Sequence, residues 1–411
     1  MLRVLAIAIA VAFLNMSATA DALHYRSVYV FNDLTDGWNP VIVGKDKNGD
    51  LVGYTNLGGS STVCGYGCGT VFKLTPDGTK TVLHTFDSAD GAAPSGMTIA
   101  DDGTLYGTTE AGSGGFGSIF KIAPDGQFST VFWFPGKMAH HQLEVPDGWK
   151  PDGGVIVGHD GNLYGTASYG GINNHCGEGG CGTVFKVTPS GEFTLLHAFG
   201  GEDADGCHPY SGVVQDAQGF LYGTTNGCGH INLGTVYKTD PATGATTTLH
   251  SFLDPSDGNG PSGPVTLDEA GNVYGLTAQG GGNCNGGVGC GTIYKIAPDG
   301  TETLIYVFKS FYQGYNPMGP LYRDHRGNLY GVTYFGGPSS KFSCISLGCG
   351  TAFKLKPGGA MILLHNFTGT PFDSSNPVSG LTPGPQPHGF YGSSRNAGDK
   401  TCCGAVYELT P

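Results

Sequence analysis

Short apolar runs alternate with glycine-rich turns along the whole chain, and residues 163–199 show this pattern most clearly. They contain three apolar runs, 163–166, 182–187 and 195–199, separated by a glycine-rich loop and a Pro-Ser-Gly turn. Runs of four to six residues that are rich in Val, Leu, Phe and Tyr and bounded by Gly and Pro indicate β-strands. The pattern predicts a small antiparallel sheet.

The same unit recurs seven times. Each copy has an aromatic-Gly or Val-Gly element followed by a Gly-Thr-apolar-Phe-Lys element or a close variant, and most copies end in a strand of the type Leu-His-x-Phe. The glycines of the first element stand at 53, 107, 165, 223, 275, 331 and 392, in steps of 54, 58, 58, 52, 56 and 61 residues. A regular period of this length is typical of repeat architectures, and it leaves no room for a separate domain.

Each copy also contains a fourth strand, which follows a loop of the type Asp-Gly-x-x-Pro; residues 210–215 are the clearest case. Four short strands joined by tight turns are the content of a propeller blade. The seventh copy stops at Pro411, where earlier copies turn into their last strand, and a matching strand stands at 26–31. We therefore expect an all-β, seven-bladed β-propeller of four-stranded blades whose last blade is closed by the N-terminal strand. An open solenoid is the alternative.

Composition fits this fold and restricts the partners. Among 411 residues, 73 Gly and 24 Pro disfavour long helices, whereas 39% hydrophobic and 13% charged residues favour a folded core over disorder. The net charge of −13, with no Lys/Arg cluster along the sequence, argues against binding nucleic acid or anionic lipid through charge.

The first twenty residues have a basic start, an apolar centre and small residues at 18–20, which predicts a signal peptide over 1–20. Residues 21–411 are then a single propeller domain. No later segment is long and apolar enough to cross a membrane. We expect a monomeric protein that is secreted or stays in the periplasm or at the cell surface.

The twelve cysteines fall in pairs, and an even number in an exported chain favours disulfides over zinc. The adjacent Cys402 and Cys403 are left open, as two thiols or as partners of other cysteines. The predicted disulfide cysteines are Cys64 with Cys68, Cys176 with Cys181, Cys207 with Cys228, Cys284 with Cys290, and Cys344 with Cys349.

The repeats resemble a known family. Tyr-Gly-Thr-Thr, the Gly-Gly doublets, Gly-Thr-Val-Phe-Lys-Leu-Thr-Pro-Asp-Gly and Leu-His-x-Phe are similar to the tandem repeats of bacterial secreted proteins called choice-of-anchor GloVer-containing proteins. The resemblance covers about residues 26–411. It implies an exported or surface repeat protein, and it brings no established activity or catalytic residues.

Binding is expected on one face of the ring. The Asp-Gly-x-x-Pro loops and the Gly-Gly/Cys loops gather there, and we call this side the loop face. Aromatic residues recur at one loop position beside an amide, an arrangement that can stack on a sugar and bond its hydroxyls; packing against a neighbouring blade is the alternative. The ligand-binding candidates are Trp38, Asn39, Trp149, Tyr169, Tyr315, Asn316 and Tyr334.

Histidines fall into two groups. His84, His197, His250 and His365 recur at one strand position and are interpreted as structural. Other histidines and carboxylates in loops of the third and fourth copies are candidates for acid–base chemistry, with solvated loop residues as the alternative. The catalytic candidates are His141, His175, His208, His230, Glu144 and Glu178. No metal and no cofactor are expected.

Three functions follow from these features. The first is a secreted, non-enzymatic propeller that recognises an extracellular carbohydrate or another cell-envelope ligand through its loop face. The second is a hydrolase or lyase of a polysaccharide or lactone that uses the histidine and carboxylate cluster. The third is a scaffold for protein partners, which would present apolar patches on the same face.

Overall fold

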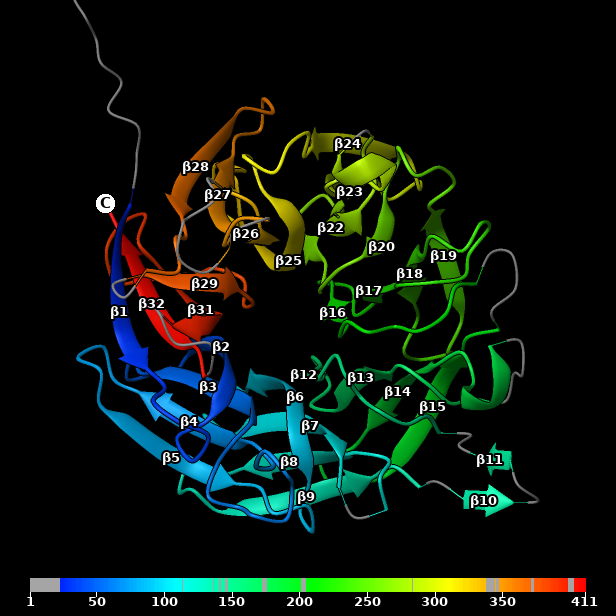
Figure 1. The fold of residues 1–411 in the computed structure, drawn as a ribbon. Coiled ribbons are helices and arrows are strands. Elements are labelled where there is room, and N and C mark those ends of the chain that lie inside the picture. Colours follow the sequence, from blue (N-terminus) through cyan, green and yellow to red (C-terminus); the bar gives the residue numbers. More distant parts are fainter. Residues whose placement is uncertain are drawn as a thin grey trace, which may run out of the picture.

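Seven sheets stand as blades around a central axis, and the chain passes round the ring once (Figure 1). The computed structural model describes residues 23–411 except 113, 136, 140–141, 145–146, 172–175, 201–204, 283, 338–343, 345–346, 371–372 and 398–402, and gives only the backbone at 137–139, 142–144, 178 and 285. The seven-bladed propeller expected from the repeats is confirmed.

The first four blades follow each other along the chain. Blade 1 contains β2 (Trp38–Lys45), β3 (Leu51–Leu57), β4 (Thr70–Leu74) and β5 (Lys80–Thr85). Blade 2 contains β6 (Ala92–Ile99), β7 (Leu105–Ala111), β8 (Ser118–Ile122) and β9 (Phe128–Trp133). Blade 3 contains β12 (Val155–Val157), β13 (Leu163–Ala167), β14 (Thr183–Val187) and β15 (Phe193–Ala198). Blade 4 contains β16 (Val214–Gln215), β17 (Leu221–Thr225), β18 (Thr235–Thr239) and β19 (Thr246–Ser251).

The other three blades complete the ring. Blade 5 contains β20 (Asn259–Pro261), β21 (Thr266–Leu267), β22 (Val273–Gln279), β23 (Thr292–Ile296) and β24 (Glu302–Val307). Blade 6 contains β25 (Tyr315–Arg323), β26 (Leu329–Phe335), β27 (Thr351–Leu355) and β28 (Met361–Asn366). Blade 7 contains β29 (Ser374–Pro377), β30 (Thr382–Pro383), β31 (Phe390–Ala397), β32 (Ala405–Thr410) and β1 (His24–Val30).

Three short elements lie outside the blade sheets. The hairpin β10 (Lys137–Ala139) and β11 (Gln142–Glu144) stands at the periphery between blades 2 and 3 (Figure 1). Two single-turn helices, η1 (Gly177–Gly179) and η2 (Asn285–Gly287), lie in loops of blades 3 and 5. In blade 4, the first strand forms its ladder only at Val214 and Gln215, so it is shorter than the predicted 210–215.

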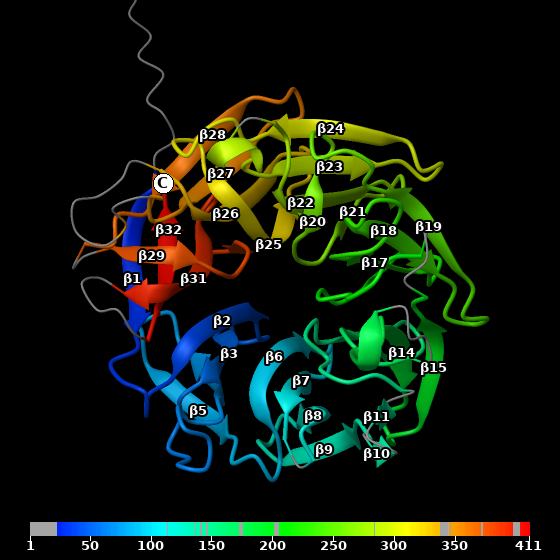
Figure 2. The same cartoon turned by 45° about the vertical axis from the view of Figure 1, so that its right-hand side comes forward.

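The N-terminal strand closes the ring. β1 pairs antiparallel with β32, with His24 opposite Thr410 and Val30 opposite Ala405, so it is the outer strand of blade 7 (Figure 2). Arg26 forms an ion pair with Glu408 at 2.6 Å. Both ends of the described chain are therefore held in one sheet, and the ring is closed, unlike an open solenoid.

The glycine of the first repeated element has a steric role. In every blade it lies directly opposite the aromatic residue of the Gly-Thr-apolar-Phe element, as Gly223 lies opposite Tyr237. A Cβ at any of these seven glycines would come under 3.0 Å from that ring. The two repeated elements therefore fit each other because the ring of the third strand occupies the space above a glycine of the second strand.

The glycine of the Gly-Thr element joins one blade to the next. It has a positive φ, and a Cβ on it would come under 3.0 Å from the proline of the following Asp-Gly-x-x-Pro loop. Gly404 of blade 7 meets Pro40 of blade 1 in the same way, so this contact also runs across the closure.

The residue before each of these prolines adopts the left-handed conformation. Its φ lies between 55° and 63° in all seven blades, a conformation that Gly and Asn tolerate best. In blades 2 to 7 its backbone N–H donates to the preceding blade, as from His208 to the carbonyl of Cys181 at 2.8 Å. The seven residues are Asn39, Ala93, Lys150, His208, Gly260, Asn316 and Asn376.

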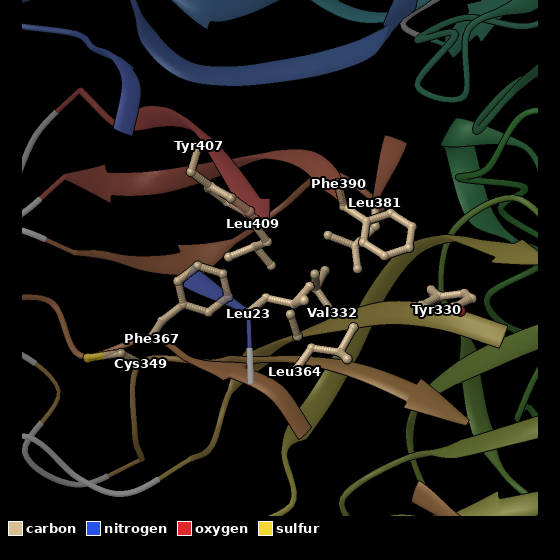
Figure 3. Packing of buried hydrophobic residues seen from close by; sticks show 11 residues of the cluster. Leu23, Tyr330, Val332, Cys349, Leu364, Phe367, Leu381, Phe390, Tyr407 and Leu409 are labelled. Carbon is tan, nitrogen blue, oxygen red and sulfur yellow. The ribbon is translucent and has the colours of Figure 1, made fainter. Parts of the chain in front are cut away.

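The hydrophobic core lies between the blades. The buried residues of the described chain form seven clusters, one at each interface between neighbouring blades. Between blades 6 and 7, Leu364 and Phe367 pack with Phe390, Leu409 and Leu23 (Figure 3). Because each sheet is covered on both faces, its strands read as nearly continuous apolar runs.

Four recurring histidines bond to carboxylates at these interfaces. Each Nε2 contacts the aspartate of the following loop, at 2.8 Å from His84 to Asp90 and at 2.9 Å from His197 to Asp205. His250 and His365 make the same contact with Asp257 and Asp373. This repetition supports the structural interpretation of the four histidines.

Candidate functional site

The central channel opens at the loop face. A cavity of about 340 Å³ on the axis is lined by residues of all seven blades, among them Gly96, Gly153, Gly212, Gly263 and Gly380. A second cavity of about 490 Å³ shares several of its lining residues and reaches the loop face; we call it the channel mouth. The polar and aromatic side chains of the channel mouth are Asn39, Tyr54, Asn56, Ser95, Glu110, Lys150, Asp152, Tyr210, Tyr334 and Arg395.

Three charged side chains meet at one wall of the channel mouth. Lys150 Nζ lies 3.5 Å from Glu110 and 3.7 Å from Asp152 Oδ1. Ser168 donates to Asp152 Oδ2 at 2.6 Å, while Asp152 Oδ1 is buried and accepts no hydrogen bond within the described residues. A buried acceptor without a donor is costly and is common where a ligand completes the site.

Burial is the main cause of the shifted pKa of Asp152 in this wall. It raises the pKa of Asp152 to about 6; Ser168 and Lys150 oppose the rise, and the nearby charge of Glu110 adds to it. Burial alone would lower the pKa of Lys150, but the two carboxylates outweigh it and the pKa is raised. A carboxyl group that titrates near pH 6 in a cavity is suited to proton transfer.

An aromatic cluster borders the same wall. The rings of Trp149 and Tyr169 stack with centroids 4.8 Å apart, and Tyr169 lies 5.0 Å from His208. The hydroxyls of Tyr169 and Tyr210 are hydrogen-bonded at 3.2 Å. Tyr210 is 41% exposed and lines the channel mouth, so the cluster leads from the loop face to the channel.

The ligand-binding candidates divide between the channel mouth and other sites. Asn39 and Tyr334 line the mouth, and Trp149 and Tyr169 belong to the adjoining aromatic cluster. Tyr334 accepts a hydrogen bond from Arg395 at 3.2 Å.

The remaining ligand-binding candidates lie outside this set. Trp38 contacts Tyr66 edge-on, and Tyr315 stacks on Phe335 within its own blade. Asn316 does not line the mouth. For Asn39 and Asn316, the left-handed backbone explains why asparagine recurs before proline, independently of any ligand.

The catalytic candidates are only partly described. His141 and His175 lie outside the described residues, and the side chains of Glu144 and Glu178 are not described. His208 Nδ1 contacts the carbonyl of Ser168 at 3.0 Å, within the aromatic cluster. His230 is exposed, and its backbone N–H donates to Ser251. His208 and His230 therefore share no bonding partner in the described chain.

Sequence reasoning did not single out Glu110, Asp152, Tyr210 or Arg395 for this site. Glu110 lies near the end of β7 in blade 2, Asp152 precedes β12 in blade 3, and Arg395 lies in β31 of blade 7. The sequence did contain one signal for this site. Lys150 and Asp152 flank the proline of the repeated Asp-Gly-x-x-Pro loop in blade 3, so two charged residues stand at a loop position of the expected binding face.

Disulfides tie the loops of the loop face. All five predicted pairs are bonded, and each pair has its Cα atoms 5.2 to 5.3 Å apart. Cys207–Cys228 joins the two loop types within blade 4, as expected if both lie on one face. Cys403 is disulfide-bonded too, and Cys402 lies outside the described residues. Such bridges are stable in oxidising compartments, which indicates an extracellular location.

Two groups in the described chain bring three potential metal ligands together. Cys176, Cys207 and Cys228 have sulfur atoms within 4.8 Å of one another, but all three are in disulfides. His250, Asp257 and Glu302 meet at the interface of blades 4 and 5. Burial, with a smaller contribution from Asp257, raises the pKa of Glu302 to about 9, which disfavours the ionised carboxylate that a metal would need.

Solved structures with this arrangement are distant in sequence. The extracellular domain of a putative hybrid two-component system from B. thetaiotaomicron matches with a TM-score of 0.53 and 12% identity, over 94% of this chain and 41% of that one. The extracellular domain of a putative one-component system from the same organism matches with a TM-score of 0.51 and 12% identity, over 93% of this chain and 40% of that one. A gluconolactonase from Xanthomonas campestris matches with a TM-score of 0.44 and 15% identity, over 94% of this chain and 89% of that one. These matches bear on the fold alone.

The family comparison covers the repeats themselves. None of the helices in the described part of the chain is long and apolar enough to span a membrane. No curated protein matches the chain. The model of the Gloeobacter/Verrucomicrobia repeat matches three overlapping stretches, 15–176, 137–289 and 173–407, and so spans every blade. The chain therefore belongs to the Gloeobacter/Verrucomicrobia repeat family.

Proposed function

We propose that the protein is an extracellular binding propeller that holds a carbohydrate, or another hydroxyl-rich cell-envelope ligand, at the channel mouth. The observation that carries this proposal is the aromatic cluster of Trp149, Tyr169, His208 and Tyr210 beside a polar cavity of about 490 Å³. Aromatic faces stack on the C–H face of sugars, while amides and charged groups bond the hydroxyls. A cavity of this volume is typical of small-ligand sites.

The charges beside the aromatic cluster favour neutral or basic glycans. Glu110 and Asp152 outnumber Lys150 there, the fourth charged residue of the mouth is Arg395 of blade 7, and the chain as a whole carries a net charge of −13. Tyr210 and Tyr169 can bond a sugar hydroxyl without a change of charge. An acidic polysaccharide would meet repulsion at this wall.

Loss of the aromatic wall is expected to weaken glycan binding. With purified protein and a panel of neutral and amino-sugar oligosaccharides, the Trp149→Ala and Tyr210→Ala variants should each bind about tenfold more weakly, as is typical of aromatic anchors. Isothermal titration calorimetry measures this change. The matched control is Tyr312→Ala, because Tyr312 is 70% exposed and does not line the mouth. No binding by the parent protein, or an equal loss in the control, contradicts the proposal.

The raised pKa of Asp152 supports a second candidate function, the cleavage of a polysaccharide or lactone by a hydrolase or lyase reaction at the same channel mouth. Asp152 would supply the proton, with Glu110 and Tyr210 beside it. The candidate differs from one based on loop histidines, because His208, the imidazole that the described residues place in the aromatic cluster, contacts a backbone carbonyl.

Replacement of Asp152 by Asn should abolish such turnover and yet stabilise the fold. Since folding raises this pKa from 3.8 to about 6, the favourable contribution of Asp152 is complete below pH 3.8 and is lost as the pH rises through 6. We expect Asp152→Asn to gain about 3 kcal/mol at pH 7.5 and less than about 1 kcal/mol at pH 4.

Thermal unfolding at both pH values, together with assays of sugar and lactone release, measures these effects. Asp160→Asn is the matched control in the same blade, because hydrogen bonds outweigh burial there and lower the pKa, so the sign should reverse. Turnover that persists in Asp152→Asn removes this candidate.

A further inference from the structure

A separate cavity lies between blades 5 and 6, on the side of the ring opposite the loop face. It has a volume of about 560 Å³. Its walls are the turn between β25 and β26, the turn between β27 and β28, and residues of β22, β23 and β24. Because neighbouring strands are antiparallel, these turns and the loops of the channel mouth are at opposite ends of the blade. We call this cavity the basic cleft.

The cleft gathers positive charge in an acidic protein. Four of the 20 Lys and Arg residues of the chain line it, together with His325, and no Asp or Glu is among the lining residues. None of these four side chains forms an ion pair within the described chain, whereas Lys73 pairs with Asp46 at 2.6 Å in blade 1. The four residues are Lys295, Arg323, Arg326 and Lys356.

One donor of the cleft is buried without an acceptor. Arg323 Nε is inaccessible to solvent and has no hydrogen-bond partner in the described chain. The guanidinium carbon lies 5.6 Å from the ring centroid of Tyr274, which holds the side chain against the wall. A buried guanidinium donor that lacks an acceptor is costly, so a turn of the Arg323 side chain that brings Nε to an anion in the cleft would be favourable.

Arg326 and Lys356 are particular to blade 6, whereas Lys295 belongs to the repeated Gly-Thr-apolar-Phe-Lys element. The turn of blade 6 reads Asp-His-Arg-Gly-Asn, whereas the same turn reads Ala-Asp-Asp-Gly-Thr in blade 2 and Asp-Glu-Ala-Gly-Asn in blade 5. The place of Lys356 is taken by Thr75 in blade 1 and by Ala297 in blade 5. In blade 5, Asp268 bonds to Asn272 and Tyr274, so Lys295 has no ion-pair partner there.

We propose that the basic cleft is a binding site for a phosphate or sulfate group, free or as an ester of a sugar. Two guanidinium forks and two ammonium groups match a multiply charged tetrahedral anion better than a single carboxylate. The volume leaves room for a sugar ring next to the anion. The site is independent of the channel mouth and lies on the opposite side of the ring, so it would fix the protein to an anionic polymer while the loop face stays free.

The test is a calorimetric titration of the full protein with inorganic phosphate, sulfate and acetate at low salt. Phosphate and sulfate should bind more tightly than acetate, and binding should weaken as salt is added. Arg326→Ala and Lys356→Ala should each reduce the affinity about tenfold, the effect of one charge-assisted hydrogen bond. Both residues are exposed, so the variants should fold.

A matched control separates a site from general surface charge. Lys47→Ala removes one charge from the equivalent turn of blade 1, which does not line the cleft, and should change the affinity less than about twofold. A second set of titrations uses a sugar phosphate and a sulfated oligosaccharide. If these esters bind more tightly than the inorganic ions, the ligand of the cleft is an ester; if they bind equally well, it is the free anion. No binding of either anion, or an equal loss in Lys47→Ala, overturns the proposal.

Discussion

A chain that lacks residues 24–31 is expected to lose its cooperative unfolding transition. These residues supply the outer strand of blade 7, and their removal exposes the edge of β32 from Ala405 to Thr410. Phe31 is fully buried in the cluster between blades 7 and 1. Removal of one such phenylalanine side chain costs about 3–5 kcal/mol, and a domain has only about 5–15 kcal/mol in total. The deletion therefore removes most of the stability.

A circular permutant distinguishes closure from a general effect of shortening. His24 lies opposite Thr410, as Phe193 lies opposite Val187 in blade 3, where five residues make the turn. Residues 23–31 placed after Pro411 through a similar turn should therefore restore the melting transition seen by circular dichroism. If the deleted chain melts at the temperature of the parent protein, the N-terminal strand does not close the ring.

The fold could be predicted because the same residue types recur at the same spacing in seven copies. The aromatic-Gly and Gly-Thr elements recur because a ring lies above the first glycine and a proline of the next blade lies against the second. Such contacts depend on residues at fixed spacing, so they leave a pattern in the sequence. That pattern alone predicts that the strand at 26–31 belongs to the last blade.

The channel mouth could be predicted only in part. Its side chains come from blades that are far apart in sequence, and Asp152, Tyr210 and Arg395 stand at positions without a repeated residue type. The recurrence of Asn39 and Asn316 pointed to ligand amides, but the left-handed backbone before proline is sufficient to explain it. A repeat therefore identifies positions that build the ring, whereas a site consists of the positions where the copies differ.

Gly223→Ala is expected to destabilise the protein by about 2–4 kcal/mol, although it adds one methyl group to a strand. The new Cβ would come 2.6 Å from Cζ of Tyr237 and still closer to its hydroxyl oxygen. Tyr237 is fully buried between the blades, so its ring cannot move aside without disturbing Phe199 and Val184. Equilibrium unfolding in urea measures the loss.

Tyr237→Phe should recover part of this loss. The hydroxyl of Tyr237 is the atom nearest to the new methyl group, and it is buried without a partner in the described chain. Its removal alone should be neutral or stabilising by about 1 kcal/mol, as is consistent with Phe72 and Phe120 at the same position of blades 1 and 2. A favourable coupling energy in the double-mutant cycle is therefore expected. Gly65→Ala is the matched control, because a Cβ there meets nothing within 4 Å; an equal loss in both alanine variants would show that the ring does not set the requirement for glycine.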